Sequence, residues 1–226
     1  ENQRPSDRTL RVEDVREALQ SRALYYDKAG EEHYNLISAF IKSLRGSDPD
    51  AALYWMARML AGGEDPLFIA RRMVIFASED VGNADPTAVS VALSAIEAAH
   101  FVGLPEAALN LSQAVTYLAT APKSNASCRA LSGAQVAARE HGSLPVPLSL
   151  RNAPTGLMRN LGYGRDYEYP HDDPDAVVPA EYLPDELAGT VFYRPTDRGY
   201  EKTIRDRLTR WREIRRGKAK NRRGGS

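Results

Sequence analysis

The chain has 226 residues, 42% of them hydrophobic and 27% charged, and its 30 basic and 30 acidic residues give a formal net charge of zero. This length can bury the core of one large domain or two small ones, and no apolar run approaches the ~20 residues that span a bilayer. The single Cys128 excludes an internal disulfide framework and fits a reducing compartment. We therefore expect a soluble globular protein and, because the chain begins at Glu1 without a methionine, a part of a longer one.

Two amphipathic helices open the predicted structure. Residues 12–24 place Val12, Val15 and Leu19 on one side of the first helix. The second helix begins the stretch HYNLISAFIKSLRGSDPDAALYW, residues 33–55, which predicts two helices and the turn between them. One face of this second helix is apolar and consists of Tyr34, Leu36, Ile37, Phe40, Ile41 and Leu44.

A capped turn follows, and a proline like the one in this turn recurs at regular intervals along the chain. Gly46 stands where a left-handed C-terminal cap is expected, Asp48 can accept the free N–H groups of the next helix, and Pro49 fits its first turn. Further prolines stand at positions 66, 86, 105 and 122, at intervals of 17, 20, 19 and 17 residues. Each interval holds one helix of about three to four turns and a short connection. The pattern predicts five successive helices between residues 49 and 141.

Two of these helices are almost uncharged. Residues 87–100 contain one carboxylate, Glu97, and residues 106–121 contain one, Glu106. Helices that are apolar on nearly all sides are buried on nearly all sides. We therefore expect them either to lie at the centre of the domain or to be covered by a partner subunit.

The composition of the sequence changes after His141. Residues 146–196 are rich in Pro, Gly, Tyr and Asp and lack helical periodicity, apart from a short predicted helix at 154–161. A short strand pair is expected around residues 190–193. Asp197 is the predicted N-cap of a final helix that carries most of the basic residues of the C-terminal region.

The sequence contains no recognisable catalytic or nucleotide-binding motif. It lacks a G-x-x-x-x-G-K-[ST] phosphate-binding loop, a dinucleotide fingerprint and a nucleophile elbow. The four histidines are scattered, with no second histidine and no paired cysteines at metal-ligand spacing. We therefore assign no catalytic, cofactor-binding or metal-ligating residue to this chain.

A weaker candidate for chemistry is a helical hydrolase site. Glu79 and Asp80 form a carboxylate pair that, with His33, could serve acid–base catalysis. Such carboxylates more often cap helices or bind a neighbouring arginine, here Arg71 or Arg72. The favoured interpretation is that all three candidate residues are structural.

Two further groups have a functional and a simpler interpretation. His171, Asp172 and Asp173 could ligate a metal ion, but the surrounding prolines favour a solvated acidic loop. Tyr54 and Trp55 could form a binding platform, but their place in an apolar helix favours a role in the core.

The C-terminal region has the only direct argument for a macromolecular partner. Residues 200–226 contain eleven Lys and Arg against three carboxylates, a local charge of +8, whereas residues 166–186 contain eight carboxylates and no Lys or Arg. The basic helix could contact a phosphate backbone, or it could fold onto the acidic segment of its own chain, and the sequence favours neither. The candidate nucleic-acid contacts are Arg205, Arg210, Arg212, Arg215, Arg216 and Lys218.

Several blocks in this chain resemble the C-terminal part of the MgsA-type AAA+ ATPases, the family of replication-associated recombination protein A and Werner-helicase-interacting protein. The resemblance covers about residues 12–210. Its blocks occur in the family's order and are YYDKAGEEHYNLISAFIKSLRGSDPDAALYWMARMLAGGEDPLFIARRMVIFASEDVGNADP, GLPEAALNLSQAVTYLATAPKSNA and VPLSLRNAPTGLM.

The resemblance implies an ATPase related to clamp loaders that acts at stalled or damaged replication forks in the bacterial cytoplasm, at the nucleoid. It implies that ATP and Mg²⁺ bind to an N-terminal AAA+ module, which this chain lacks, and that a helical C-terminal region assembles four subunits. DNA and single-stranded-DNA-binding protein are the implied partners, and no membrane is. No catalytic residue of the family can be carried over to this sequence.

These inferences define the expected architecture and function. The fold is predicted to be all-α, with stacked helical hairpins like those of a clamp-loader C-terminal domain. The predicted parts are the end of the AAA+ lid at 1–25, the oligomerisation domain at 26–145, the irregular segment at 146–196, and the basic helix with a disordered tail at 197–226. The main hypothesis is a tetramerisation domain; the alternative is a nucleic-acid or protein adaptor that works through the basic helix.

Overall fold

The structure, a computed structural model, describes Val12 and residues 31–224, so the predicted first helix lies outside the described residues except for Val12. The regular structure of the described residues is helical and contains no strand, which confirms the all-α prediction. The chain divides into two compact units. Among the described residues, unit 1 consists of 31–80 and 87–121, and unit 2 consists of 81–86 and 122–224.

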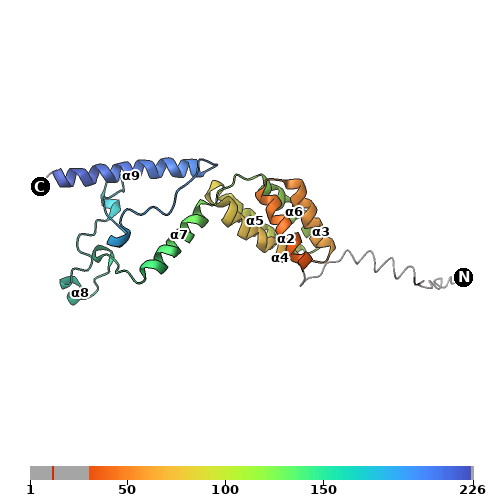
Figure 1. Ribbon diagram of the computed structural model, residues 1–226, viewed down its shortest axis with the longest axis horizontal. Coiled ribbons are helices and arrows are strands. Elements are labelled where there is room, and N and C mark those ends of the chain that lie inside the picture. The colour runs from red at the N-terminus through yellow and green to blue at the C-terminus, as the bar shows by residue number, and fades with distance from the viewer. Residues whose placement is uncertain (1–11, 13–30, 225–226) are drawn as a thin grey trace. The chain divides into compact units, whose positions relative to one another are not determined.

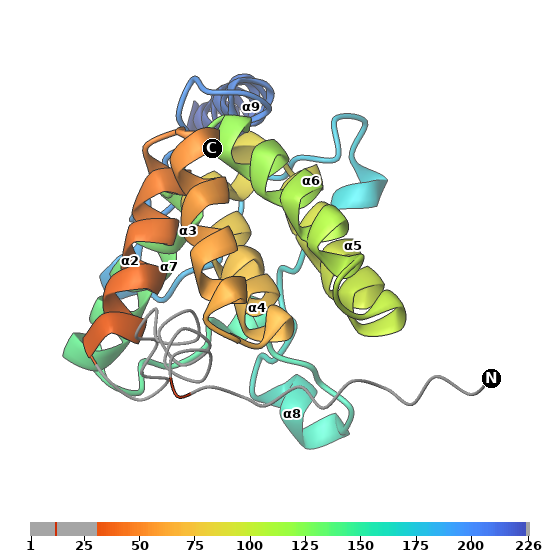
Figure 2. The same ribbon diagram turned by 90° about the vertical axis from the view of Figure 1, so that its right-hand side faces the viewer.

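Five α-helices build the described part of unit 1, and Figures 1 and 2 show them side by side as a bundle. They are α2 (Glu31–Arg45), α3 (Pro49–Ala61), α4 (Pro66–Phe76), α5 (Thr87–Val102) and α6 (Ala107–Thr120). Helix α6 packs against each of the other four helices. With α7 of unit 2, these elements confirm the prediction of five successive helices between residues 49 and 141.

The core of unit 1 consists of large apolar side chains from α2, α3, α4 and α6. Each such side chain, when fully buried, stabilises the fold by about 1.5–3 kcal/mol relative to an exposed one. The fully buried residues of this kind are Phe40, Leu44, Met59, Ile69, Met73, Phe76, Leu111, Val115 and Leu118.

Two predictions about aromatic residues are wrong. Tyr34, expected on the apolar face of α2, is 68% exposed, and Tyr54, expected in the core, is 57% exposed. In α3 the buried residues are Ala52, Met56 and Met59, so the core-facing side of that helix is already taken. The apolar pattern therefore predicted the buried face of each helix correctly, but it also included an aromatic residue at the border of that face that is in fact exposed.

The turn between α2 and α3 follows the predicted capping with one correction. The Asp48 carboxylate accepts the N–H of Ala51 at 2.9 Å, and Pro49 stands in the first turn, as predicted. The left-handed residue is Ser47, with φ 61°, and not Gly46. The reason is that Gly46 still donates a helical hydrogen bond to the carbonyl of Lys42. The helix therefore ends one residue later than predicted, where the N–H groups of Ser47 and Asp48 donate to the carbonyls of Leu44 and Ser43.

The two nearly uncharged helices are buried to different degrees. Helix α6 buries six residues along its length. Helix α5 buries only the alanines of one side, Ala88, Ala92, Ala95 and Ala99. The expected central position therefore applies to α6, whereas much of the apolar surface of α5 is exposed in unit 1.

Unit 2 contains α7 (Ala126–His141), the short α8 (Gly156–Asn160) and the long α9 (Glu201–Gly224). The described residues between α7 and α9 are otherwise turns, short 3-10 helices and irregular chain, as predicted. The predicted helix near residues 154–161 is confirmed. The predicted strand pair near 190–193 is wrong, because the N–H of Thr190 closes a turn onto the carbonyl of Leu187 instead of entering a ladder.

The start of α9 is fixed by a buried carboxylate, which we call the Glu201 cluster. Glu201 is fully buried and accepts hydrogen bonds from the hydroxyls of Ser124 (2.6 Å), Tyr193 (2.9 Å) and Thr196 (2.8 Å) and from the N–H of Thr196 (2.7 Å). The predicted N-cap, Asp197, is therefore wrong. The helix begins four residues later, at Glu201, because this carboxylate binds the chain that leads into it.

Close backbone approaches surround the Glu201 cluster. The N–H of Tyr200 donates to the carbonyl of Ala84 at 2.8 Å. A Cβ atom on Gly199 would lie 2.1 Å from the Ala84 oxygen, and one on Gly82 would lie 2.8 Å from the Ser124 oxygen. Only glycine fits these two positions. The absence of a side chain there lets segments 82–84, 122–127 and 193–201 pack with their backbones in contact.

We predict that acid weakens unit 2 through Glu201. Burial by itself raises the pKa of the Glu201 carboxyl, but hydrogen bonds from Ser124, Thr196 and Tyr193 outweigh burial and lower this pKa below its ordinary value. The carboxylate therefore stabilises the fold fully above the unfolded-state pKa, and this stabilisation is lost as the pH falls through the lower folded-state pKa. The melting temperature should fall from about pH 4.5 downward, and less steeply in Glu201→Gln. Equal pH dependence in both proteins would contradict the role of Glu201.

We also predict that Gly199→Ala destabilises the protein by more than about 2 kcal/mol in urea unfolding, because the new Cβ meets the Ala84 carbonyl in a backbone with φ +51°. Gly189→Ala is the matched control. It has the same left-handed backbone, with φ +75°, but open space around the added Cβ. Its expected destabilisation is about 1 kcal/mol, and a loss as large as that of Gly199→Ala would remove the argument from the close approach.

Candidate nucleic-acid interface

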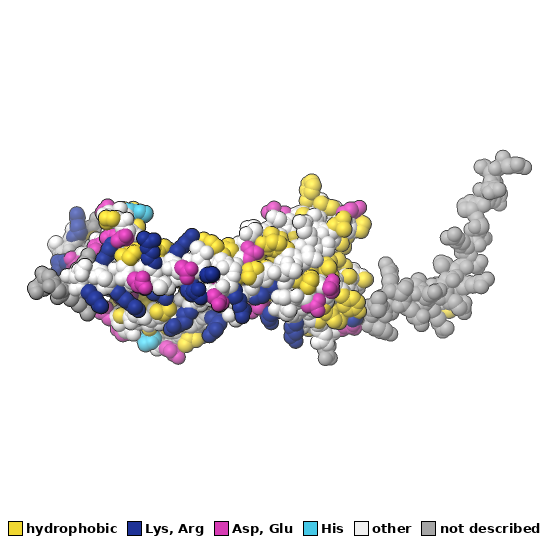
Figure 3. Space-filling view, turned by 90° about the horizontal axis from the view of Figure 1, so that it is seen from above, with side chains coloured by type: hydrophobic (Ala, Val, Ile, Leu, Met, Phe, Trp, Pro, Cys, Tyr) yellow, Lys and Arg dark blue, Asp and Glu magenta, His cyan; other side chains and the backbone are white. Residues whose placement is uncertain are grey.

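Five cations follow one face of α9 and form what we call the α9 stripe. They recur at helical spacing, three or four residues apart, with the uncharged Thr209 completing the row. The row spans about 27 Å at 1.5 Å per residue. In Figure 3, Lys and Arg side chains stand along this helix. The members of the α9 stripe are Lys202, Arg205, Arg212, Arg216 and Lys220.

The α9 stripe is exposed and carries net positive charge. Its side chains are exposed except that of Arg205, which is half-buried and lies 3.6 Å from the Asp206 carboxylate. Asp206 and Glu213 flank the row, so five cations and two carboxylates leave a charge of +3. A row of exposed cations at this spacing suits the regularly spaced phosphates of a nucleic-acid backbone.

Other cations of α9 are directed at the protein itself. The Lys218 ammonium binds the carboxylates of Asp173 and Asp175 and donates to the Val177 carbonyl at 3.0 Å. This contact raises the pKa of Lys218 and lowers that of Asp173. The Arg215 guanidinium lies 5.8 Å from the centre of the Tyr182 ring. These two residues therefore contact the acidic segment of their own chain.

The six predicted contact residues thus fall into different groups. Arg205, Arg212 and Arg216 belong to the α9 stripe, Arg210 is exposed beside it, and Arg215 and Lys218 face the acidic segment. The contact with the acidic segment of the same chain is therefore observed for Lys218 and Arg215, and contact with a nucleic acid stays a prediction for the exposed residues. Lys202 and Lys220 share the row with three of the candidates but were not among them, although the helical period of three to four residues could have placed them there.

The acidic loop does not form a metal site in the described part of the chain. Pro170–Asp172 is one turn of 3-10 helix, and the rings of His171 and Tyr169 lie 5.1 Å apart. No group of three or more His, Cys, Asp or Glu side chains among residues 31–224 is arranged to hold a metal ion. Asp173 is bound to Lys218, so the loop is tied to α9 and is not simply solvated.

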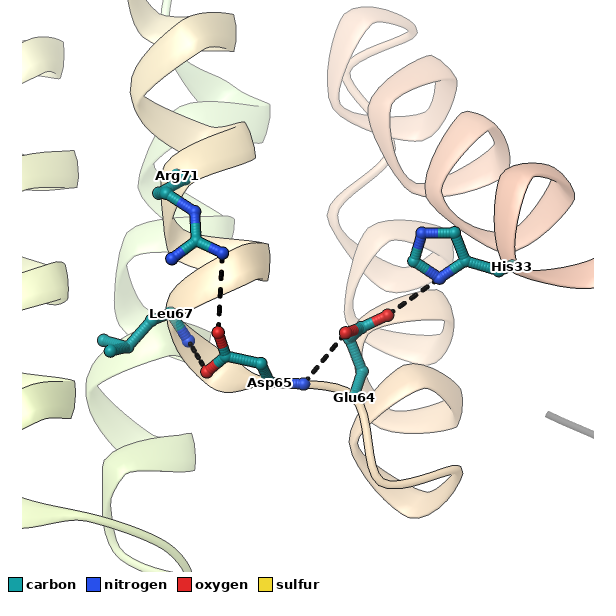
Figure 4. A network of polar contacts seen from close by, with 5 residues as sticks. All are labelled: His33, Glu64, Asp65, Leu67 and Arg71. Carbon is teal, nitrogen blue, oxygen red and sulfur yellow. Dashed lines mark hydrogen bonds and ion pairs between the residues drawn. The ribbon is translucent and has the colours of Figure 1, made fainter. Parts of the chain in front are cut away.

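His33 ties the start of α2 to the turn between α3 and α4 (Figure 4). Its Nδ1 lies 2.9 Å from one oxygen of Glu64, whose other oxygen accepts the N–H of Asp65 at 2.9 Å. Asp65 in turn caps α4 through the N–H of Leu67 and pairs with Arg71 at 3.4 Å. This arrangement confirms the structural interpretation of His33.

Asp80 pairs with Arg45, and not with Arg71 or Arg72 as predicted. The two oxygens of Asp80 accept hydrogen bonds from Arg45 at 2.6 and 3.0 Å, which raises the pKa of Arg45. The π-helical segment Ala77–Val81 follows α4 and re-aims the carboxylate toward α2. Since His33 and Arg45 are twelve residues apart on α2, about 18 Å, the hydrolase candidates are not brought together.

Comparisons with known proteins agree with this architecture. A family model described as "MgsA AAA+ ATPase C terminal" matches residues 46–212, and one described as "AAA C-terminal domain" matches residues 1–45. No helix in the described part of the chain is long and apolar enough to cross a membrane.

Similar proteins come from bacteria and from a eukaryote. Replication-associated recombination protein A of Haemophilus influenzae is 50% identical over 214 residues, 94% of this chain and 47% of that protein. The protein of the same name from Escherichia coli is 48% identical over 89% of this chain and 45% of its own length. ATPase WRNIP1 of Dictyostelium discoideum is 46% identical over 77% of this chain and 20% of its own length.

The chain spans about half the length of the bacterial relatives it matches. The family match covers most of its residues and falls on the C-terminal part of the family's proteins. The chain therefore belongs to the MgsA family of AAA+ ATPases and contains the C-terminal part of such a protein.

Proposed function

We propose that this chain is the part of a replication-associated AAA+ ATPase that holds four subunits together. The supporting observation is an apolar surface at the hairpin formed by α5 and α6. Phe101 is 90% exposed and Leu109 is 72% exposed, and Leu93, Val102 and Leu104 are each about half exposed. Four of these residues fall within 101–109, around the connection between the two helices, and exposed apolar side chains that gather in this way mark a contact with another molecule.

Beside this surface, α5 and α6 form a groove that suits a helix from another subunit. The cavity has a volume of about 340 Å³ and is lined by small or uncharged side chains. Small residues let helix backbones approach closely, and a lining of four apolar and four uncharged polar side chains suits a helix that is itself uncharged. The lining residues are Ser90, Val91, Ser94, Ala95, Ala98, Asn110, Gln113 and Ala114.

The activity of the whole protein then resides outside this chain. ATP and Mg²⁺ bind to the AAA+ module in the part of the relatives that this chain does not span, and the assembled ring acts on DNA in replication and recombination. Single-stranded-DNA-binding protein is the proposed protein partner, and the nucleoid in the bacterial cytoplasm is the proposed location. The names of the bacterial relatives, which refer to replication and recombination, support this proposal.

Absolute mass by light scattering on a size-exclusion column, at two salt concentrations, tests the assembly. The expected result is a salt-resistant species of four 25.0 kDa chains. Leu109→Asp should reduce the mass, because it places a charge in the proposed interface. Leu157→Asp is the matched control, since Leu157 of α8 is 70% exposed outside the α5–α6 surface. A monomer at both salts, or equal effects of the two substitutions, would contradict the proposal.

A second proposed function, DNA binding through the α9 stripe, rests on its exposed row of cations. The triple variant Arg205→Gln, Arg212→Gln, Arg216→Gln should make the slope of log affinity against log salt shallower by roughly 2 to 3 on duplex DNA, because each phosphate contact contributes about 0.9. The affinity should fall for all sequences alike.

The control for this experiment removes the same charge elsewhere in unit 2. Arg129, Arg139 and Arg159 are exposed and lie outside α9, so their triple replacement by Gln should leave the salt slope close to that of the unchanged protein. Fluorescence anisotropy with a labelled oligonucleotide measures the salt slopes of the stripe variant and of the control variant. An unchanged slope in the stripe variant would exclude the α9 stripe as the DNA contact.

A further inference from the structure

A small cavity in unit 1 lies outside every surface considered so far. Its volume is about 280 Å³, and it is lined by the second half of α2, the second half of α4 and the π-helical segment Ala77–Val81. Its apolar lining comes from isoleucines of α2 and α4 and from Phe76. Its polar and charged lining consists of Ser38, Lys42, Arg45, Arg72, Glu79 and Asp80.

The charges around this cavity, which we call the Arg72 cavity, are unequally paired. Arg45 and Asp80 neutralise each other through their two hydrogen bonds. The Nε–H of Arg72 is buried and has no acceptor within the part of the chain that the structure describes. A buried N–H without an acceptor is unfavourable, and a guanidinium is especially suited to an oxyanion. Lys42 adds a second cation, against the single exposed carboxylate of Glu79.

The backbone at the Arg72 cavity is also unusual. Ala77–Val81 is a π-helix, a form that occurs mostly as single turns inside or beside α-helices and is frequent at functional sites. It directs Asp80 to Arg45, so that this carboxylate does not reach the Arg72 guanidinium in place of a ligand. Among the described residues, Arg72 therefore forms no ion pair, although two carboxylates line the same cavity.

We propose that the Arg72 cavity is a phosphate-binding site. The terminal nitrogens of the Arg72 guanidinium bind the phosphate oxygens, the Lys42 ammonium adds charge at the exposed side, and the Ser38 hydroxyl lies in the lining as a further donor. The Arg45–Asp80 pair lines one side of the cavity and limits where the phosphate can lie. The apolar lining lowers the local dielectric and strengthens the contacts. The phosphate is that of a free nucleotide or of a nucleic-acid backbone, two sources with the same recognised group.

The site is tested with three probes on the whole chain: inorganic phosphate, adenosine monophosphate and a short single-stranded oligonucleotide. Phosphate is compared with chloride at matched ionic strength by the shift in melting temperature, and the other two are measured by calorimetric titration. Arg72→Gln and Lys42→Gln should each weaken binding roughly tenfold, the effect of losing one charged hydrogen bond. Arg72→Lys, which keeps the charge but loses the planar guanidinium fork, should be intermediate.

Arg71→Gln is the matched control. Arg71 is the neighbouring residue of α4, is exposed and pairs with Asp65, as Figure 4 shows. The proposal holds if phosphate or a phosphate ester binds and the Arg72 and Lys42 variants lose binding while the Arg71 variant keeps it. Tighter binding of the mononucleotide identifies a free nucleotide as the source, and tighter binding of the oligonucleotide identifies a backbone. Equal binding by all variants, or no binding of any probe, overturns it. Lys42 is exposed, so its variant decides the outcome even if Arg72→Gln does not fold.

Discussion

The buried carboxylate of Glu201 is the interaction on which unit 2 depends. Among its described residues, unit 2 buries few apolar side chains larger than alanine, namely Val81, Val177 and Val178, so polar contacts must define its form. Four hydrogen bonds satisfy Glu201 and join the start of α9 to Ser124 and to the chain at Tyr193 and Thr196. Because the carboxylate belongs to the first turn of α9, it also satisfies the chain entering the helix and sets the direction in which α9 leaves.

The direction of α9 determines what each of its cations does. One side of the helix, with Ile204 and Leu208, is half-buried, and the cations next to it reach their own acidic segment through Lys218 and Arg215. The α9 stripe is directed away from those contacts. A net charge of zero for the whole chain therefore conceals one group of charges that is internally satisfied and another that is available to a partner.

Unit 1 follows a different principle, since apolar packing defines it. Helix α6 occupies the centre and contacts all its neighbours, whereas α5 contributes only alanines to the core. Small side chains give close helix packing but little buried area, and the larger side chains of α5, such as Phe101, remain outside. The same packing leaves Arg72 beside a cavity with its Nε–H buried. The exposed side chains of α5 and the Arg72 guanidinium thus lie where the core is packed without them.

Signals that act over a few residues determined much of this protein from its sequence alone. The cap at Asp48, the proline intervals and the period of 3.6 predicted the helices of residues 33–141, because each depends only on local geometry. Tertiary structure alone decided the pairings, since Glu201 meets Ser124 across 77 positions, Arg45 meets Asp80 across 35, and Lys218 meets Asp173 across 45. Sequence spacing carries no information at such separations. Only the folded chain brings these groups within hydrogen-bonding distance, and only then is it decided which charges remain for a partner.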